Sequence, residues 1–219
     1  MTAPRDLPTA GSPDGLWAPA RRGLTTGLVL STTFVAAEAL AVITIMPRVA
    51  RDLGGLNLYG WVFSAFMLGS LVGAVAAGRA ADRGGPARPF IAGLVLFGVG
   101  LAVAGFAPSM AVLVAGRALQ GLGAGAVPAV SYVAIGRGLP ARLRPRMLAV
   151  LASAWVLPGL LGPVLSVAVA DVFGWRWVFI GLTPLVALAG LLALPALVRL
   201  GPPRVDAVAE HGLLDAVRA

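Results

Sequence analysis

The residues of this sequence most able to do chemistry are two charged side chains inside apolar stretches, Glu38 and Arg117. A charge within membrane hydrocarbon costs about 2.5 to 3.5 kcal/mol on insertion scales, so it must face protein, water or an opposite charge. Glu38 lies past the middle of its stretch and Arg117 before the middle of its own, so in antiparallel helices both would lie toward the outer side of the membrane. At about 1.5 Å of rise per helical residue, their depths differ by roughly 5 Å, which allows an ion pair, direct or through water.

Three interpretations of these charges are open. A carboxylate beside an arginine can release and regain a proton as the surrounding pocket fills and empties, which would couple proton movement to solute movement. The pair could instead be a fixed link between two helices. Arg117 could also extend its side chain alone to the outer membrane interface. Under the first interpretation Gln120, one turn after Arg117, hydrogen-bonds the cargo.

The remaining composition argues against catalysis. The chain has no cysteine, and its single histidine, His211, lies outside the apolar stretches. These stretches carry no grouping of nucleophiles, metal ligands or acid and base residues. We therefore expect the protein not to be an enzyme and to hold no metal or cofactor. Under the first interpretation of Glu38 and Arg117, a proton gradient is its expected energy source.

Six long apolar stretches must position the charged residues. The 219 residues are 58% hydrophobic and 12% charged, with a mean hydropathy of +0.91, which is too apolar for a soluble domain. A membrane helix needs about 20 apolar residues to cross ~30 Å of hydrocarbon. The sequence thus predicts an all-α membrane protein with six helices, at residues 23–46, 59–77, 89–107, 110–135, 147–169 and 177–198.

Arginine placement predicts the orientation of these helices. The net charge is +8, and outside the spans only Arg48, Arg51 and Arg176 lie on one side, whereas all other arginines lie on the opposite side. Such an excess is typical of cytoplasmic loops and needs no nucleic-acid partner. We expect a multi-pass protein of a bacterial inner (plasma) membrane, with both termini cytoplasmic. Trp175 and Trp177 are predicted to anchor a helix end at the membrane interface.

The flanks of the membrane domain, residues 23–198, are predicted to be cytoplasmic as well. Residues 1–22 are rich in proline and glycine and are expected to form a disordered lead. Residues 199–219 are expected to be a cytoplasmic tail or the start of a linker to a second half.

An internal repeat appears when the chain is shifted by 89 positions. Because three predicted helices separate the two copies, the repeat would be inverted, with Asp82 in a cytoplasmic loop and Asp171 in an outer one. Chance matching among abundant small residues is the alternative. The matched pairs include Ser64 with Ser153, Ala65 with Ala154, Gly73 with Gly162, Ala81 with Ala170, Asp82 with Asp171, Gly85 with Gly174 and Phe90 with Phe179.

The loop predicted after the second helix carries a glycine and charge motif, made of Gly78, Asp82, Arg83, Gly85 and Arg88. Its glycines would permit close backbone approach and a tight turn, and its aspartate could meet the positive end of a facing helix. We expect this loop to gate a conformational change. An ordinary positively charged cytoplasmic loop is the alternative.

Two further motifs lie within the helices. On the fourth helix, Arg117 and Gln120 are followed by Gly121 and Gly125, whose four-residue spacing provides a close-packing surface. The fifth helix contains prolines and glycines that should bend it near Ala154 and let it pack closely, although tight packing without a functional bend is also possible. The residues of this bend motif are Pro158, Gly159, Gly162 and Pro163.

Together these motifs resemble the signatures of the major facilitator superfamily. The fourth-helix motif matches without a gap, whereas the loop motif departs at Pro86 and Ala87 and the fifth-helix motif, which resembles an antiporter signature, departs at Ser166 and Val167. The resemblance implies half of a major facilitator fold, the N-terminal six helices as a 3+3 inverted repeat. Members usually have about twelve or fourteen helices in two related halves.

The resemblance also implies a function. Acidic residues of the first helix and the arginine of the second signature are implicated in coupling among drug/proton antiporters. We therefore expect a secondary transporter that exports a small organic solute or drug by alternating access. The alternative is a truncated, non-transporting half or a membrane assembly partner. Expected partners are the lipid bilayer, a small-molecule substrate, and a missing C-terminal half or a second copy.

Overall fold

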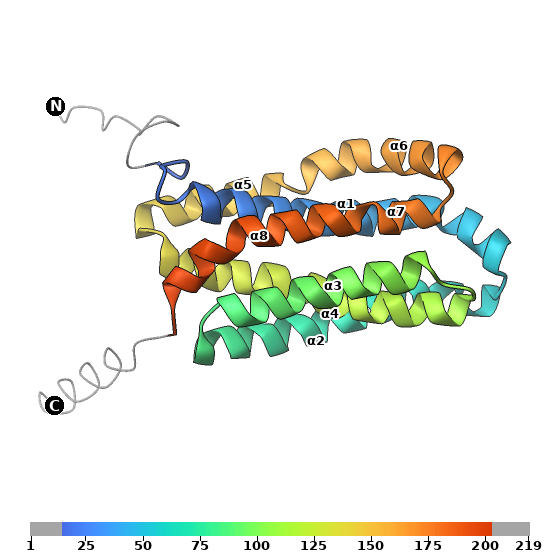
Figure 1. Ribbon diagram of the computed structural model, residues 1–219, viewed down its shortest axis with the longest axis horizontal. Coiled ribbons are helices and arrows are strands. Elements are labelled where there is room, and N and C mark those ends of the chain that lie inside the picture. Colours follow the sequence, from blue (N-terminus) through green and yellow to red (C-terminus); the bar gives the residue numbers. More distant parts are fainter. Residues whose placement is uncertain (1–14, 203–219) are drawn as a thin grey trace, which may run out of the picture.

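The computed structural model describes residues 15–202, whose helices run side by side in one elongated bundle (Figure 1). Within these residues there is no strand, and six helical stretches are long and apolar enough to cross a membrane. The predicted all-α, six-span architecture is confirmed. The helices are α1 (Arg22–Leu53), α2 (Tyr59–Gly84), α3 (Ala87–Gly105), α4 (Met110–Gly138), α5 (Arg144–Ser153), α6 (Val156–Val172), α7 (Arg176–Ile180) and α8 (Leu182–Leu200).

Short 3₁₀ turns extend two of the spans at their starts. The turns are η1 (Leu56–Leu58), before α2, and η2 (Ala141–Leu143), before α5. The fifth span therefore consists of η2, α5 and α6, and the sixth of α7 and α8. Both described ends of the chain lie at the same end of the bundle, as an even number of crossings requires (Figure 1).

The helix ends differ from those that hydropathy predicted. The stretch from Gly78 to Arg88, predicted as a loop, is mostly helical, because α2 continues to Gly84 and α3 begins at Ala87. Hydropathy detects only the part of a helix inside the hydrocarbon, whereas alanine and arginine continue the helix beyond it. The real turn is short, and Gly85 makes it with a φ of 89°.

The 89-residue repeat is visible in the packing. The helices α2 and α3 of the first copy pack against α4 of the second, and the helices α6 and α8 of the second copy pack against α1 of the first. Each copy thus packs its second and third helices against the first helix of the other. The turn glycines also correspond, since Gly85 has a φ of 89° and Gly174 one of 91°. Half of the superfamily-like fold, with its inverted repeat, is therefore present.

Glycines bring α2 and α4 into close contact. A Cβ atom at Gly73 would lie within 3.0 Å of the Leu122 backbone, and one at Gly125 would overlap the Ser70 carbonyl oxygen. Such positions leave no space for a larger residue without moving a helix. The predicted packing surface on α4 is confirmed.

Replacement of Gly73 by alanine is expected to destabilise the chain by about 1 to 3 kcal/mol, because the added methyl group meets backbone atoms of α4. The control is Gly78→Ala on the same helix, where nothing lies within 4 Å of the added methyl. Alanine there should be neutral or stabilise by up to about 1 kcal/mol through helix propensity. Unfolding titrations in detergent compare the two, and equal effects would contradict the close approach.

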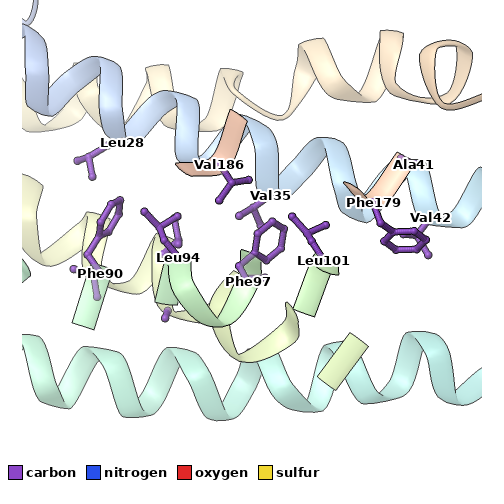
Figure 2. Close-up of a cluster of buried hydrophobic side chains, with 14 of the residues drawn as sticks. Leu28, Val35, Ala41, Val42, Phe90, Leu94, Phe97, Leu101, Phe179 and Val186 are labelled. Carbon is purple, nitrogen blue, oxygen red and sulfur yellow. The ribbon is translucent and has the colours of Figure 1, made fainter. Parts of the chain in front are cut away.

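Buried apolar side chains join α1, α3, α7 and α8. Figure 2 shows Phe90, Leu94, Phe97 and Leu101 of α3 directed toward α1 and the last span. Leu28, Val35 and Val42 of α1 are buried in the same cluster, together with Phe179 and Val186. This packing holds α1, the helix that carries Glu38, against α3 and the last span.

The fifth span behaves differently from its repeat counterpart. Its helix breaks between α5 and α6 at Ala154 and Trp155, where Pro158 removes a donor to the Ala154 carbonyl. The predicted close packing through its glycines is wrong. A Cβ at Gly159 would have its nearest neighbour at 4.0 Å, and one at Gly162 at 3.9 Å, so neither glycine is pressed against α1.

Part of the predicted N-terminal lead lies within the described residues. Residues 15–21 form turns, in which Leu16 is buried and its carbonyl accepts a hydrogen bond of 3.0 Å from the Thr25 hydroxyl. The predictions for residues 1–14 and 203–219 concern parts outside the described residues.

Candidate functional site

The structure brings Glu38 and Arg117 together in the interior of the bundle. Glu38 comes from the middle of α1, and Arg117 and Gln120 come from the N-terminal part of α4. The relative exposure of Glu38 and Gln120 is 0%, and that of Arg117 is 2%. Arg117 therefore does not extend to the interface, which excludes one of the three interpretations.

Three helices hold the Arg117 guanidinium. Its Nη1 donates to Oε1 of Glu38, in a buried ion pair, and to Oε1 of Gln120 at 2.9 Å. Its Nε donates to the Val62 carbonyl of α2 at 3.3 Å. The Phe66 ring of α2 lies 4.1 Å from the guanidinium carbon, in a cation–π contact. The charge is thus met by a counter-charge, two neutral oxygens and an aromatic face.

The site keeps unused hydrogen-bonding capacity. Oε2 of Glu38 and Nε2 of Gln120 are buried, and neither has a hydrogen-bond partner among the described residues. One is an acceptor and the other a donor, so a proton, a water molecule or a cargo group could satisfy them.

A central hollow of about 550 Å³ lies beside the ion pair. Its lining is apolar and aromatic, with few hydroxyls and no charged residue. Phe66 lines it while also covering Arg117, so one ring touches both the hollow and the charge. The Thr32 hydroxyl is buried without a partner. The lining residues are Thr32, Val35, Ala39, Phe66, Met67, Ser70, Leu71, Ala74, Ala124, Gly125, Pro128, Ala129, Tyr132 and Trp155.

Comparison with known proteins decides the family. The profile of the Major Facilitator Superfamily matches residues 17–216, nearly the whole chain. The chain belongs to the major facilitator superfamily. A probable multidrug-efflux transporter of Mycobacterium tuberculosis is 35% identical over 178 residues, which cover 80% of this chain and 38% of that protein. Multidrug resistance protein 3 of Bacillus subtilis is 32% identical, covering 74% of this chain and 32% of its own length.

Solved structures agree with the superfamily fold. The D-xylose-proton symporter superposes with a TM-score of 0.64 at 17% identity, covering 90% of this chain and 52% of the symporter. The human organic anion transporter MFSD10 gives the same TM-score at 20% identity, covering 82% of this chain and 48% of the transporter. The chain spans less than two fifths of the curated relatives above and about half of these structures.

The other two motifs of this superfamily chain lie away from the ion pair. The gating residues occupy the end of α2 and the start of α3, where Gly85 lies against the Gly201 backbone of the last span. Gly78 approaches no neighbour, so it is not needed for close packing there. The bend residues lie on α6, and the nearest neighbours of an added Cβ at Gly159 and Gly162 belong to Leu40 and Ala37 of α1. The gating and bending roles of these residues stay predictions.

The sequence analysis did not predict a group of polar contacts at the C-terminal end of α1. Arg48 pairs with Asp171 at 2.6 Å, and the Trp175 indole donates to Asp52 at 2.8 Å. Arg176 stacks on Trp175 at 4.3 Å and donates to the Ala107 carbonyl at 3.2 Å. Trp175 is therefore buried, and its prediction as an interfacial anchor is wrong. The repeat, which pairs Asp171 with Asp82 of the loop motif, is the sequence signal that could have singled out Asp171 as a contact residue.

Proposed function

We propose that this chain forms one half of a proton-coupled secondary transporter that exports a small organic solute by alternating access. The observation that carries the proposal is the buried Glu38–Arg117 pair, joined to the central hollow by the Phe66 ring. The names of the relatives, which include multidrug-efflux transporters, support the same direction. The superfamily match over nearly the whole chain gives the alternative, a non-transporting assembly partner, no support of its own.

The coupling follows from competition for Arg117. With the hollow empty, the guanidinium neutralises Glu38, and Oε2 remains open to a proton. Cargo that enters the hollow displaces Phe66, and thereby changes the contact that holds Arg117 against Glu38. A proton on Glu38 weakens its attraction to Arg117. Proton and cargo therefore both act on the contact between Glu38 and Arg117, which couples the binding of one to the binding of the other. Gln120 holds Arg117 in place while its free Nε2 donates to cargo or water.

We also propose that protein outside the described residues supplies a second wall of the hollow. The hollow lies between α1, α2 and α4, with Trp155 at its edge, and the matched relatives are more than twice as long as this chain. We propose that a C-terminal half, or a second copy of this chain, closes it. We further propose, from the placement of the arginines, that both termini and the arginine-rich loops lie in the cytoplasm.

Ethidium binding tests the hollow as the cargo site. Planar aromatic dyes suit a lining that contains Phe66, Tyr132 and Trp155, and bound dye should quench the fluorescence of Trp155. In proteoliposomes, an imposed proton gradient should drive ethidium across the membrane. Dye that leaves Trp155 fluorescence unchanged, compared with a Trp155→Phe control, would refute the site.

A second test concerns the buried hydroxyl of Thr32. Thr32→Val is expected to weaken binding of a cargo that carries a hydrogen-bonding group by about fivefold, the effect of losing one hydrogen bond of about 1 kcal/mol. Thr33→Val is the matched control, since the Thr33 hydroxyl already bonds the Val29 carbonyl at 2.8 Å and does not line the hollow. Fluorescence titration measures both, and equal affinities would contradict a role for Thr32.

A further inference from the structure

A second cavity, which we term the lateral groove, lies on the other flank of α1. It has a volume of about 580 Å³, and α6, α7 and α8 form its remaining walls. Ser166 carries the one hydroxyl of the lining, and that hydroxyl already donates to the Pro163 carbonyl at 2.9 Å. The lining residues are Ala37, Ala41, Gly162, Leu165, Ser166, Val169, Phe173, Trp177, Val178, Gly181, Leu182 and Leu185.

The groove exists because the two repeat copies pack differently. Gly73 of α2 is pressed against α4, whereas its counterpart Gly162 has its nearest neighbour 3.9 Å from an added Cβ. Small residues on α1, Ala37 and Ala41, face this side. Space that closes between α2 and α4 thus stays open between α1, α6 and α8. In Figure 1, α6 lies at the edge of the bundle.

We propose that the lateral groove holds one acyl chain of a membrane phospholipid. Apart from the indole N–H of the exposed Trp177, at one end of the groove, its lining offers no free hydrogen-bonding group and no charge, which suits a hydrocarbon occupant. Along α6 the groove runs from Gly162 to Phe173, eleven residues, or roughly 16 Å at 1.5 Å per residue. That length is about half of a ~30 Å hydrocarbon core, the reach of one acyl chain in its leaflet.

The mouth of the groove is placed at the outer membrane interface. Phe173 and Trp177 line the groove at the end of α6, with ring centroids 6.5 Å apart, and both side chains are exposed. Aromatic rings favour the level of the lipid headgroups. An empty apolar groove would forfeit dispersion contacts along its whole length, whereas surrounding lipid tails can supply them.

Native mass spectrometry of the chain extracted in mild detergent tests the proposal. The wild-type chain should retain one phospholipid. Gly162→Leu places a side chain in the groove without backbone overlap, and should retain roughly tenfold less, as expected when about two methylenes lose their contacts. Leu160→Phe is the matched control, because Leu160 lies on the same helix, outside the groove, and is 73% exposed.

Val169→Phe fills the same groove from a different position and keeps the test decisive if Gly162→Leu does not fold. Both filled variants should lose lipid while the control keeps it. A wild-type chain without lipid, or filled variants that retain as much as wild type, would overturn the proposal. A second copy bound in place of lipid, and lost in the filled variants, would overturn it as well. The readout requires no transport, so it stands apart from the proposed function.

Discussion

Glu38→Gln is expected to destabilise the chain by about 3 to 5 kcal/mol, because it leaves the buried Arg117 without its counter-charge. Arg117→Met should cost less, since the carboxyl of Glu38 can become neutral by binding a proton, whereas a guanidinium does not lose one. The stability lost in Arg117→Met should shrink as the pH is lowered toward 5, because the Glu38 carboxyl binds a proton more readily there. The loss in Glu38→Gln should not change over that range. Detergent unfolding titrations at two pH values measure both.

A more exposed ion pair, between Arg48 of α1 and Asp171 of α6, provides the control. The side chains of Arg48 and Asp171 are 35% and 57% exposed, so Arg48→Gln should cost at most about 1 kcal/mol. The double variant Glu38→Gln with Arg117→Met removes both buried charges and should recover much of the stability lost in Glu38→Gln alone. If Arg48→Gln proved as costly as Glu38→Gln, burial would not be what gives the Glu38–Arg117 pair its importance.

Removal of both charges is also expected to abolish proton-driven transport in a chain that still folds. In proteoliposomes the double variant should bind ethidium in the central hollow yet show no accumulation when a proton gradient is imposed, because no group remains to exchange the proton. Wild type should accumulate the dye, and Glu38→Asp, which keeps a carboxylate on a shorter arm, should retain part of the activity.

This variant separates coupling from architecture. If the Glu38–Arg117 pair merely links α1 to α4, a well-folded double variant should transport as wild type does, with the same dependence on the gradient. Unchanged gradient-driven uptake would therefore leave Glu38 without a coupling role and would favour the fixed-link interpretation.

The sequence predicted the six spans and allowed a Glu38–Arg117 pair, while leaving open that Arg117 extends alone to the interface. Hydropathy identifies spans because the hydrocarbon requires about 20 apolar residues. The ion pair follows from depth, since two isolated charges at one level have few other partners. Neither argument reaches Val62 and Phe66, which contact Arg117 from α2. Their part depends on which helix packs beside α4, and helix spacing alone does not determine that.

Two of the errors, at Gly162 and Trp175, share one physical origin, because each concerns what lies opposite a residue. Gly121 and Gly162 both belong to small-residue motifs. A Cβ added at Gly121 would lie within 3.0 Å of the Phe66 backbone, whereas one added at Gly162 would have its nearest neighbour at 3.9 Å. Trp175 lies at a helix end, where an interfacial anchor is expected, but Asp52 and Arg176 draw it into the bundle. A sequence pattern indicates the face that a helix offers, and the fold determines whether a neighbour fills it.

Infrared difference spectroscopy on cargo addition tests the central claim most directly, because it observes the Glu38 carboxyl itself. Cargo binding to the wild-type chain should change a carboxyl band, and that change should be absent in the Glu38→Gln variant and shifted in Glu38→Asp. A spectrum in which cargo binds and no band assignable to Glu38 changes would contradict proton exchange at the Glu38–Arg117 pair.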